Sequence, residues 1–134
     1  MAISGNPPLA VAAPAGRAAI LVVEDEFLIR IVICDELREA GYRVIEAASA
    51  DEALAMLQSG VEVDLIFSDV RTPGAINGLE LLAEVRKSSP DLPVIIASGH
   101  LQPDTTFDDR TDFLSKPYNL NNVVNLINNR LKYQ

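Results

Sequence analysis

Short apolar runs alternate with amphipathic segments from Ala18 to the end of this 134-residue chain. The apolar runs have the length of strands, and the segments between them repeat apolar residues every three or four positions, which is the period of a helix. This alternation is typical of parallel strands in one sheet with helices on both faces. We therefore predict a doubly wound α/β domain over residues 18–134, with strands at residues 18–23, 42–47, 63–68, 92–98 and 112–116.

Four segments between and after these runs carry helix signals. A stripe of apolar residues marks the last one, and a Ser49–Glu52 capping box opens the second. The connection from Ser98 to the fifth strand is different, because Pro103, paired threonines and paired aspartates are poor helix formers. A helix in that connection is expected to be short or disordered. The four predicted helices cover residues 26–41, 49–60, 77–89 and 119–131.

Composition excludes several classes of protein. The chain has 11 basic and 19 acidic residues, a net charge of −8, and no basic stripe, which argues against direct binding of nucleic acid. No apolar stretch approaches the ~20 residues of a membrane span, so a cytoplasmic protein without membrane contact is expected. The single cysteine, Cys34, lies in an apolar helical pattern and is predicted to be a core residue. Residues 1–17 are rich in Ala, Pro and Gly and are predicted to be a disordered tail.

Polar residues follow four of the five predicted strands. In a sheet of this class, binding sites form outside the carboxyl ends of the strands. Glu24 and Asp25 follow the first strand, Asp69 follows the third, and Ser98 and Lys116 end the fourth and fifth. We expect these side chains to meet at one edge of the sheet.

Taken singly, each of these residues has an ordinary interpretation as a helix cap or a solvated loop residue. Together they do not, because two carboxylates about 5 Å apart repel by roughly 3 kcal/mol at an effective dielectric near 20. Lys116 supplies one compensating charge, and a divalent cation would supply more. Oxygen ligands without His or Cys favour Mg²⁺, with Mn²⁺ as the alternative. A carboxylate nucleophile beside a cation, a lysine and a hydroxyl predicts a phosphoryl-accepting site.

Five ordered segments carry a resemblance to a known family: VVEDE, DLIFSDVRTPG, NGLEL, IIASG and FLSKP. From about residue 18 onward the chain resembles the receiver domain of bacterial two-component response regulators. The resemblance implies a flavodoxin-like fold with strand order 2-1-3-4-5. It also implies the following roles: Asp69 as phosphoacceptor, Lys116 as the phosphoryl contact, Asp25 and Asp69 as metal ligands, Glu24 as a ligand acting directly or through water, the Arg71 carbonyl as a further ligand, and Ser98 and Phe113 as the switch pair.

The same resemblance implies a function. The domain would take a phosphoryl group from a histidine kinase or histidine phosphotransferase and switch its binding to an unidentified downstream protein. Its only chemistry would be its own phosphorylation and dephosphorylation. Arg71 lies two residues after Asp69, and His100 lies two after Ser98, so both are predicted to face the hydrolytic water and to set the phosphate lifetime.

Two features of one loop depart from the family pattern. Thr72 stands where a methionine is usual, and the turn PGAING is one residue longer than the commonest form. Two other functions are weighed against the phosphoacceptor. A phosphorylation-independent binding module could keep this fold, and a haloacid-dehalogenase-type phosphatase would also use an aspartate nucleophile and Mg²⁺. The phosphatase would need a second aspartate at position 71, where Arg71 stands.

The last predicted helix ends close to the end of the chain. This arrangement is expected for a stand-alone receiver that acts by binding or by passing phosphate on, and an excised receiver of a larger protein is equally compatible. Homodimerisation is left open.

Overall fold

The structure is a computed structural model that describes residues 17–100 and 105–131. Its five strands are all parallel and lie in the order β2-β1-β3-β4-β5, which confirms the predicted topology. The third strand reaches one residue further than predicted and includes Asp69. Residues 1–16, most of the predicted tail, lie outside the described residues. The strands are β1 (Ala19–Val23), β2 (Arg43–Ala47), β3 (Leu65–Asp69), β4 (Val94–Ser98) and β5 (Thr111–Ser115).

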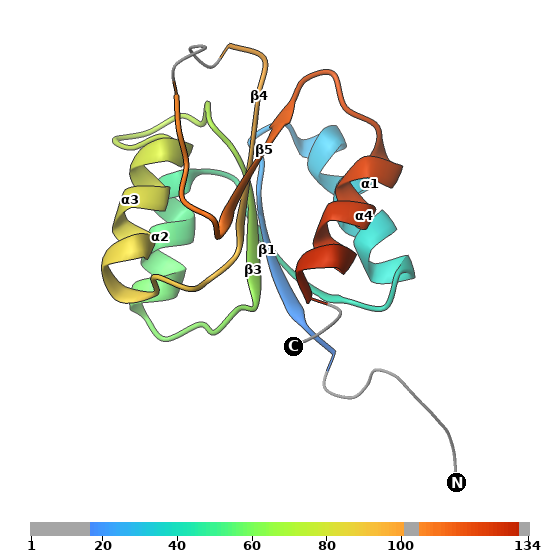
Figure 1. Cartoon of the computed structure of the whole chain (residues 1–134), viewed down its shortest axis with the longest axis horizontal. Helices are drawn as coiled ribbons and strands as arrows, with labels where there is room; N and C mark the ends of the chain where they lie inside the picture. The colour runs from blue at the N-terminus through green and yellow to red at the C-terminus, as the bar shows by residue number, and fades with distance from the viewer. Residues whose placement is uncertain (1–16, 101–104, 132–134) are drawn as a thin grey trace, which may run out of the picture.

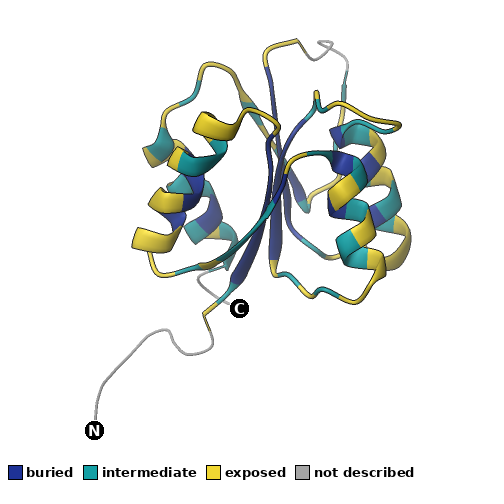
Figure 2. Cartoon of the chain, turned by 180° about the vertical axis from the view of Figure 1, so that it is seen from behind, coloured by how far each residue is buried: buried dark blue, intermediate teal, exposed yellow. Residues whose placement is uncertain are grey.

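Helices cover both faces of the sheet (Figure 1). Successive side chains of a strand point to opposite faces, so Ile20 and Val22 pack towards one pair of helices and Leu21 and Val23 towards the other. Every residue of β1, β3 and β4 is buried, which explains why these strands are apolar apart from the polar residues at the carboxyl ends of β3 and β4 (Figure 2). The first pair is α1 (Phe27–Glu39) with α4 (Leu120–Leu131), and the second is α2 (Ala50–Gln58) with α3 (Gly78–Ser88).

Cys34 lies on the inner side of α1 and is fully buried, as predicted for a core residue. Burial raises the pKa of its thiol to about 12, so it remains protonated at neutral pH. Ile33 and Leu37 are buried beside it. Ile29 and Ala40, which the helical period puts on the same side, are exposed. Within the described ranges, every helix is too short or too polar to cross a lipid bilayer.

The start of α3 lies directly against the strand that carries Asp69. Asn77 and Glu80 form a complete capping box, in which each side chain accepts a hydrogen bond from the other residue's amide. A Cβ atom on Gly78 would lie 2.3 Å from the carbonyl oxygen of Asp69, so only glycine fits. At α2, Ser49 caps the helix as predicted, but Glu52 reaches the amide of Ala48.

The connection between β4 and β5 has no helix in its described part, residues 99–100 and 105–110. The prediction of a short or disordered helix also covers residues 101–104, which lie outside the described residues. The Arg86 guanidinium anchors the connection from α3. It donates to both Asp108 oxygens, the nearer at 2.8 Å, and to Thr111 Oγ1 at 2.7 Å. It also donates to the carbonyls of Ser89, Leu92 and Arg110. A charged side chain thus holds β5 in place at its start.

Candidate functional site

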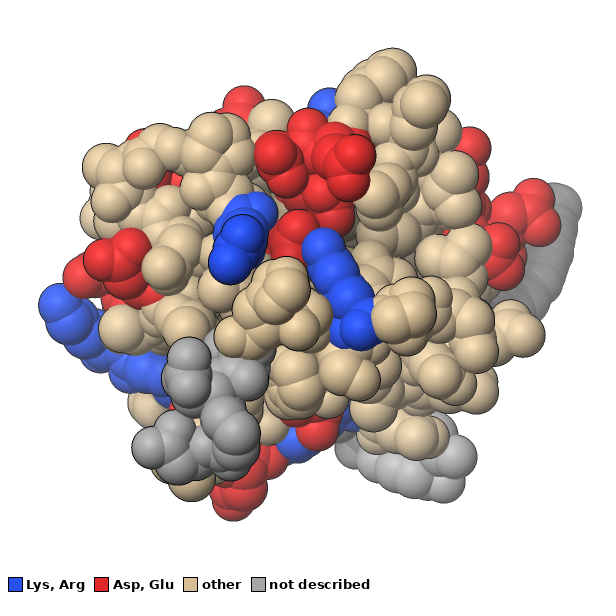
Figure 3. Space-filling model, turned by 90° about the horizontal axis from the view of Figure 1, so that it is seen from above, with Lys and Arg blue, Asp and Glu red and all other residues tan. Residues whose placement is uncertain are grey.

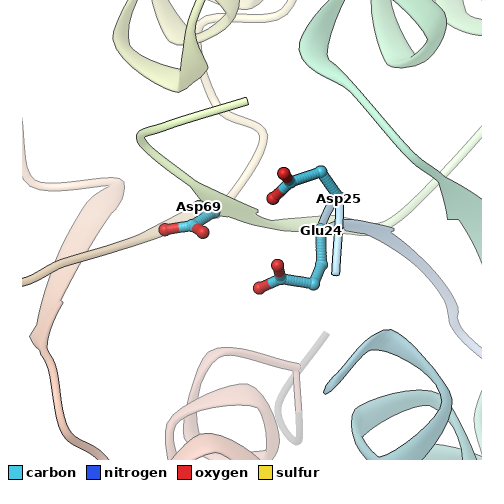
Figure 4. Close-up of side chains that lie close together, drawn as sticks. All are labelled: Glu24, Asp25 and Asp69. Carbon is cyan, nitrogen blue, oxygen red and sulfur yellow. The ribbon is translucent and has the colours of Figure 1, made fainter. Parts of the chain in front are cut away.

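Three carboxylates meet at the carboxyl edge of the sheet (Figure 4). Glu24 and Asp25 follow β1, Asp69 ends β3, and one oxygen of each lies within 4.8 Å of the others. Glu24 is 2% exposed and Asp69 7%, whereas Asp25 is open to solvent. Adjacent strand ends in the sheet therefore bring together the acidic residues that the sequence predicted to converge.

Lys116 joins this cluster from the end of β5. Its Nζ lies 2.9 Å from each of the two Asp69 carboxylate oxygens. Its backbone amide donates to the carbonyl of Ser98 at 3.0 Å, which fixes the chain after β5 to the end of β4. Viewed onto this edge, the acidic patch is flanked by basic side chains (Figure 3).

Glu24 lies in surroundings that disfavour the ionised form of its carboxyl group. Burial raises the pKa of its carboxyl, and the charges of Asp69 and Asp25 raise it further. A hydrogen bond from the amide of Glu26, at 3.0 Å, and the charge of Lys116 act in the opposite direction. When ionised, the three carboxylates carry three negative charges, and in the described part of the chain one ammonium, that of Lys116, contacts them. This oxygen-only, net-negative donor set fits Mg²⁺ or Mn²⁺.

Arg30 supports the acidic turn from behind. Its guanidinium donates to the carbonyl of Glu24 at 2.8 Å and to the Glu46 carboxylate at 3.1 Å. It therefore ties α1 and β2 to the turn that carries the acidic pair. No sequence pattern predicts this role, because the nearer partner of Arg30 is a backbone carbonyl.

A cavity of about 840 Å³ opens beside the carboxylates. Tyr118 and Ile29 line it as well, and sequence reasoning missed both. Tyr118 lies two residues after Lys116, and its ring packs edge-on against that of Phe67, with the ring centroids 5.9 Å apart. Burial, together with the charges of Glu24 and Asp69, raises the pKa of Tyr118 to about 12. The predicted site residues that line the cavity are Asp25, Asp69, Arg71, Ser98, His100 and Lys116.

The predicted switch pair is divided between the inside and the outside of the domain. Ser98 is buried at the cavity, and its Oγ accepts a hydrogen bond from the amide of His100 at 3.0 Å. Phe113 does not line the cavity. The residue is 40% exposed, and its ring stacks on that of Phe107 with the ring centroids 6.4 Å apart.

Comparison with known proteins gives this arrangement a family. The sequence model described as the response regulator receiver domain matches residues 20–128. The chain is 37% identical to the sensor kinase CckA of Brucella abortus over 124 residues, which is 89% of this chain and 13% of CckA. Other matched relatives are DNA-binding transcriptional regulators. The matched region covers 13% of the length of the sensor kinase and 25% of the length of the transcriptional regulator NtrC of Salmonella typhimurium.

Solved structures agree with the sequence comparison. The chemotaxis protein CheY4 of Vibrio cholerae has a TM-score of 0.75 and 30% identity, covering 87% of this chain and 100% of that protein. The response regulator TrrA of Thermotoga maritima, solved in complex with Mg²⁺-BeF, has a TM-score of 0.74 and 31% identity, covering 85% and 99%. The fold, the carboxyl-edge cluster and these matches agree: the chain belongs to the response regulator receiver domains, the phosphoacceptor domains of two-component and phosphorelay signalling.

Proposed function

We propose that Asp69 is the phosphoacceptor of this receiver domain and that a histidine-phosphorylated protein is the donor. The observation that carries the proposal is the placement of the Asp69 carboxylate. It lines a cavity, has an oxygen within 4.8 Å of oxygens of two further carboxylates, and contacts Lys116. A nucleophile so placed has positive charge available for the transferring group.

In the forward step, an Asp69 oxygen attacks the phosphorus atom of phosphohistidine. The new O–P bond forms as the P–N bond to imidazole breaks, and the imidazole nitrogen keeps the electron pair and takes up a proton. In dephosphorylation, water attacks the same phosphorus atom and the O–P bond to Asp69 breaks. Inorganic phosphate leaves, and the Asp69 carboxylate is regenerated. Lys116 is placed to contact a phosphoryl oxygen in both steps, since its ammonium already contacts Asp69.

The metal-binding part of the proposal uses the same carboxylates. The residues that would hold Mg²⁺ or Mn²⁺ are Asp25 and Asp69, the Arg71 carbonyl, and Glu24 directly or through water. The bound ion would supply positive charge that offsets the carboxylates and the phosphoryl oxygens. Support comes from the donor set itself, which is made of oxygen atoms and carries excess negative charge.

The response to phosphorylation would run through Ser98 and Phe113. To reach a phosphoryl oxygen, the Ser98 hydroxyl must leave the amide of His100, from which it now accepts a hydrogen bond. Phe113 would then leave its stack on Phe107 and turn inward. Arg71 and His100 line the cavity from opposite loops, where they would control the approach of the hydrolytic water.

The partner proposed here is a histidine kinase or histidine phosphotransferase, with an unidentified protein downstream. Exposed apolar side chains on α1 support a protein donor. Phe27, Leu28 and Val32 are all more than half exposed, and an apolar groove beside them shares Ile29 and Tyr118 with the phosphoacceptor cavity. A donor whose histidine enters the cavity would therefore cover this surface, burying apolar area that is otherwise in water.

The test is phosphorylation with a small acyl phosphate and Mg²⁺, followed by intact mass. Wild type should gain one phosphoryl group that is stable in acid and labile in base. Asp69→Asn should keep the fold and gain none, because the amide is nearly isosteric but is not a nucleophile. Asp35→Asn, an exposed change on α1, is the matched control and should react like wild type. Undiminished modification of Asp69→Asn would exclude Asp69 as the acceptor.

A further inference from the structure

The loop between β3 and α3, residues 70–77, is tied to the start of α2. The Asp51 carboxylate, in the first turn of α2, accepts hydrogen bonds from the amides of Ala75 at 2.9 Å and Ile76 at 3.0 Å. Hydrogen bonds to an ionised carboxylate are stronger than those between neutral groups. Gly74 permits this approach, since it has a φ of 118° and a Cβ there would lie 2.6 Å from an Asp51 oxygen.

A third hydrogen bond ties the two segments in the opposite direction. The Oγ1 of Thr72 accepts from the amide of Ala50 at 3.1 Å. Ala50 is the first residue of α2, where backbone amides have no partner within the helix. The hydroxyl of Thr72 supplies that partner, which a methionine side chain would not do well. Both departures of this loop from the family pattern therefore take part in one contact with α2.

The ends of the loop are fixed separately. The amide of Val70 donates to the carbonyl of Ala97 at 3.0 Å, and the amide of Gly78 donates to the carbonyl of Val70 at 2.7 Å. Arg71 lies between the fixed end and Thr72, and it lines the phosphoacceptor cavity. The contacts with α2 therefore determine how the Arg71 peptide is presented to the site.

We propose that Asp51 and Thr72 are positioning residues for the phosphoacceptor site, acting through Arg71. They orient the Arg71 carbonyl towards the metal position and its side chain over the cavity. The inference rests on the proposed function, in which that carbonyl is a metal ligand. Neither residue lines the cavity. Their effect is to hold a ligand in place, a task for which loss of the supporting group typically weakens metal affinity.

The experiment compares Asp51→Ala and Thr72→Val with Glu52→Ala. Glu52 is the adjacent acidic residue of the same helical turn, so its replacement removes the same charge without touching the loop. Three quantities are measured: the Mg²⁺ dissociation constant by calorimetry, amide hydrogen exchange at residues 70–77 without metal, and the decay rate of the phosphorylated protein.

Asp51→Ala should raise the Mg²⁺ dissociation constant roughly tenfold, speed exchange at Ala75 and Ile76, and change the decay rate. Thr72→Val should act in the same direction, and it decides the question if Asp51→Ala does not fold. Glu52→Ala should leave all three quantities near those of wild type. Equal effects of the Asp51 and Glu52 changes would overturn the inference, because loss of α2 stability alone would then explain them.

The outcomes also separate this inference from the proposed function. If wild type is phosphorylated at Asp69 and Asp51→Ala binds Mg²⁺ as tightly as wild type does, only the positioning role is overturned. Wild type that takes up neither Mg²⁺ nor a phosphoryl group overturns both.

Discussion

Glu24 lies so close to the other site carboxylates that their negative charges disfavour its ionised form. It is buried beside Asp69, its pKa is raised, and Lys116 contacts only the Asp69 member of the cluster among the described residues. The cluster resembles other binding sites in which stability is given up for a ligand. That cost should be measurable in the metal-free protein.

Asp25→Asn should therefore raise the melting temperature in the presence of a chelator. Removing one charge relieves repulsion with Glu24 and Asp69, and a gain of about 1 kcal/mol corresponds to roughly 3 to 6 °C for a domain of this size. In millimolar Mg²⁺ the order should reverse, because the wild type binds the ion more tightly and is stabilised by mass action. Thermal unfolding in both buffers makes the measurement. A variant that is less stable than wild type in chelator would contradict stored repulsion at this site.

At the scale of an element, the described part of the connection between β4 and β5 is anchored by an ionic contact with α3. Asp108 accepts hydrogen bonds from Arg86, Thr111 and the amide of Arg110. The bond from Arg86 contributes most to lowering the pKa of Asp108, to about 2. The side chain is 43% exposed, so its stabilising effect is partly screened by solvent.

This contact predicts a pH dependence. The folded pKa lies below the unfolded value, so the carboxylate stabilises the fold above about pH 4, and this stabilisation is lost as the pH falls towards 2. Asp108→Asn should cost on the order of 1 kcal/mol at pH 7, and the cost should shrink between pH 4 and pH 2. Urea unfolding of both proteins across that range measures it. Asp109→Asn, a change of the exposed neighbour, is the control and should show a smaller difference. A cost independent of pH would mean that shape, not charge, anchors the connection.

The aromatic stack in the same connection predicts a second behaviour. Phe113 is held outside by Phe107, and Ser98 is held by the amide of His100. Adding Mg²⁺ and beryllofluoride, a phosphoryl analogue, should release both, so that fluorine-labelled Phe113 changes its NMR shift. Phe107→Leu should move the free protein towards the shifted position, since it weakens the outward contact. An unchanged Phe113 signal on adding the analogue would show that this ring is not the switch.

At the scale of the whole molecule, the phosphoacceptor cavity and an exposed apolar surface lie side by side. The carboxyl edge holds the cavity, and the apolar surface of α1 lies next to it. Leu28, 74% exposed, has few contacts to lose within the domain. The donor for the test is the histidine kinase that phosphorylates wild type fastest in a panel from the source genome. With this donor, Leu28→Ala should slow phosphoryl transfer about tenfold, which corresponds to about 1.4 kcal/mol of lost contact free energy. Reaction with a small acyl phosphate should be unchanged. Equal slowing with both donors would place the defect in the site itself.

Much of this architecture could be predicted because it follows from the spacing of apolar residues and from the residues at the ends of strands. Alternating apolar runs predict the sheet and its helices, and the residues that follow the strands predict the site. What could not be predicted depends on backbone placement. Arg86 and Arg30 bind carbonyl groups that every residue has, and Asp51 binds amides of a loop whose path no pattern specifies. Periodicity also placed Ile29 with the core face of α1, although the structure leaves it at the mouth of the cavity.

The sequence order of the site residues determines when the site can be completed during synthesis. β1 pairs with β2 and β3, and each later strand joins an edge that earlier strands have formed. The three carboxylates are present once β3 has emerged from the ribosome, whereas Lys116 follows Asp69 by 47 residues. At translation rates of about 5 to 20 residues per second, that interval lasts roughly 2 to 10 seconds. During it the chain contains all three carboxylates but not the ammonium that contacts Asp69, so the complete site can form only after β5 has been synthesised.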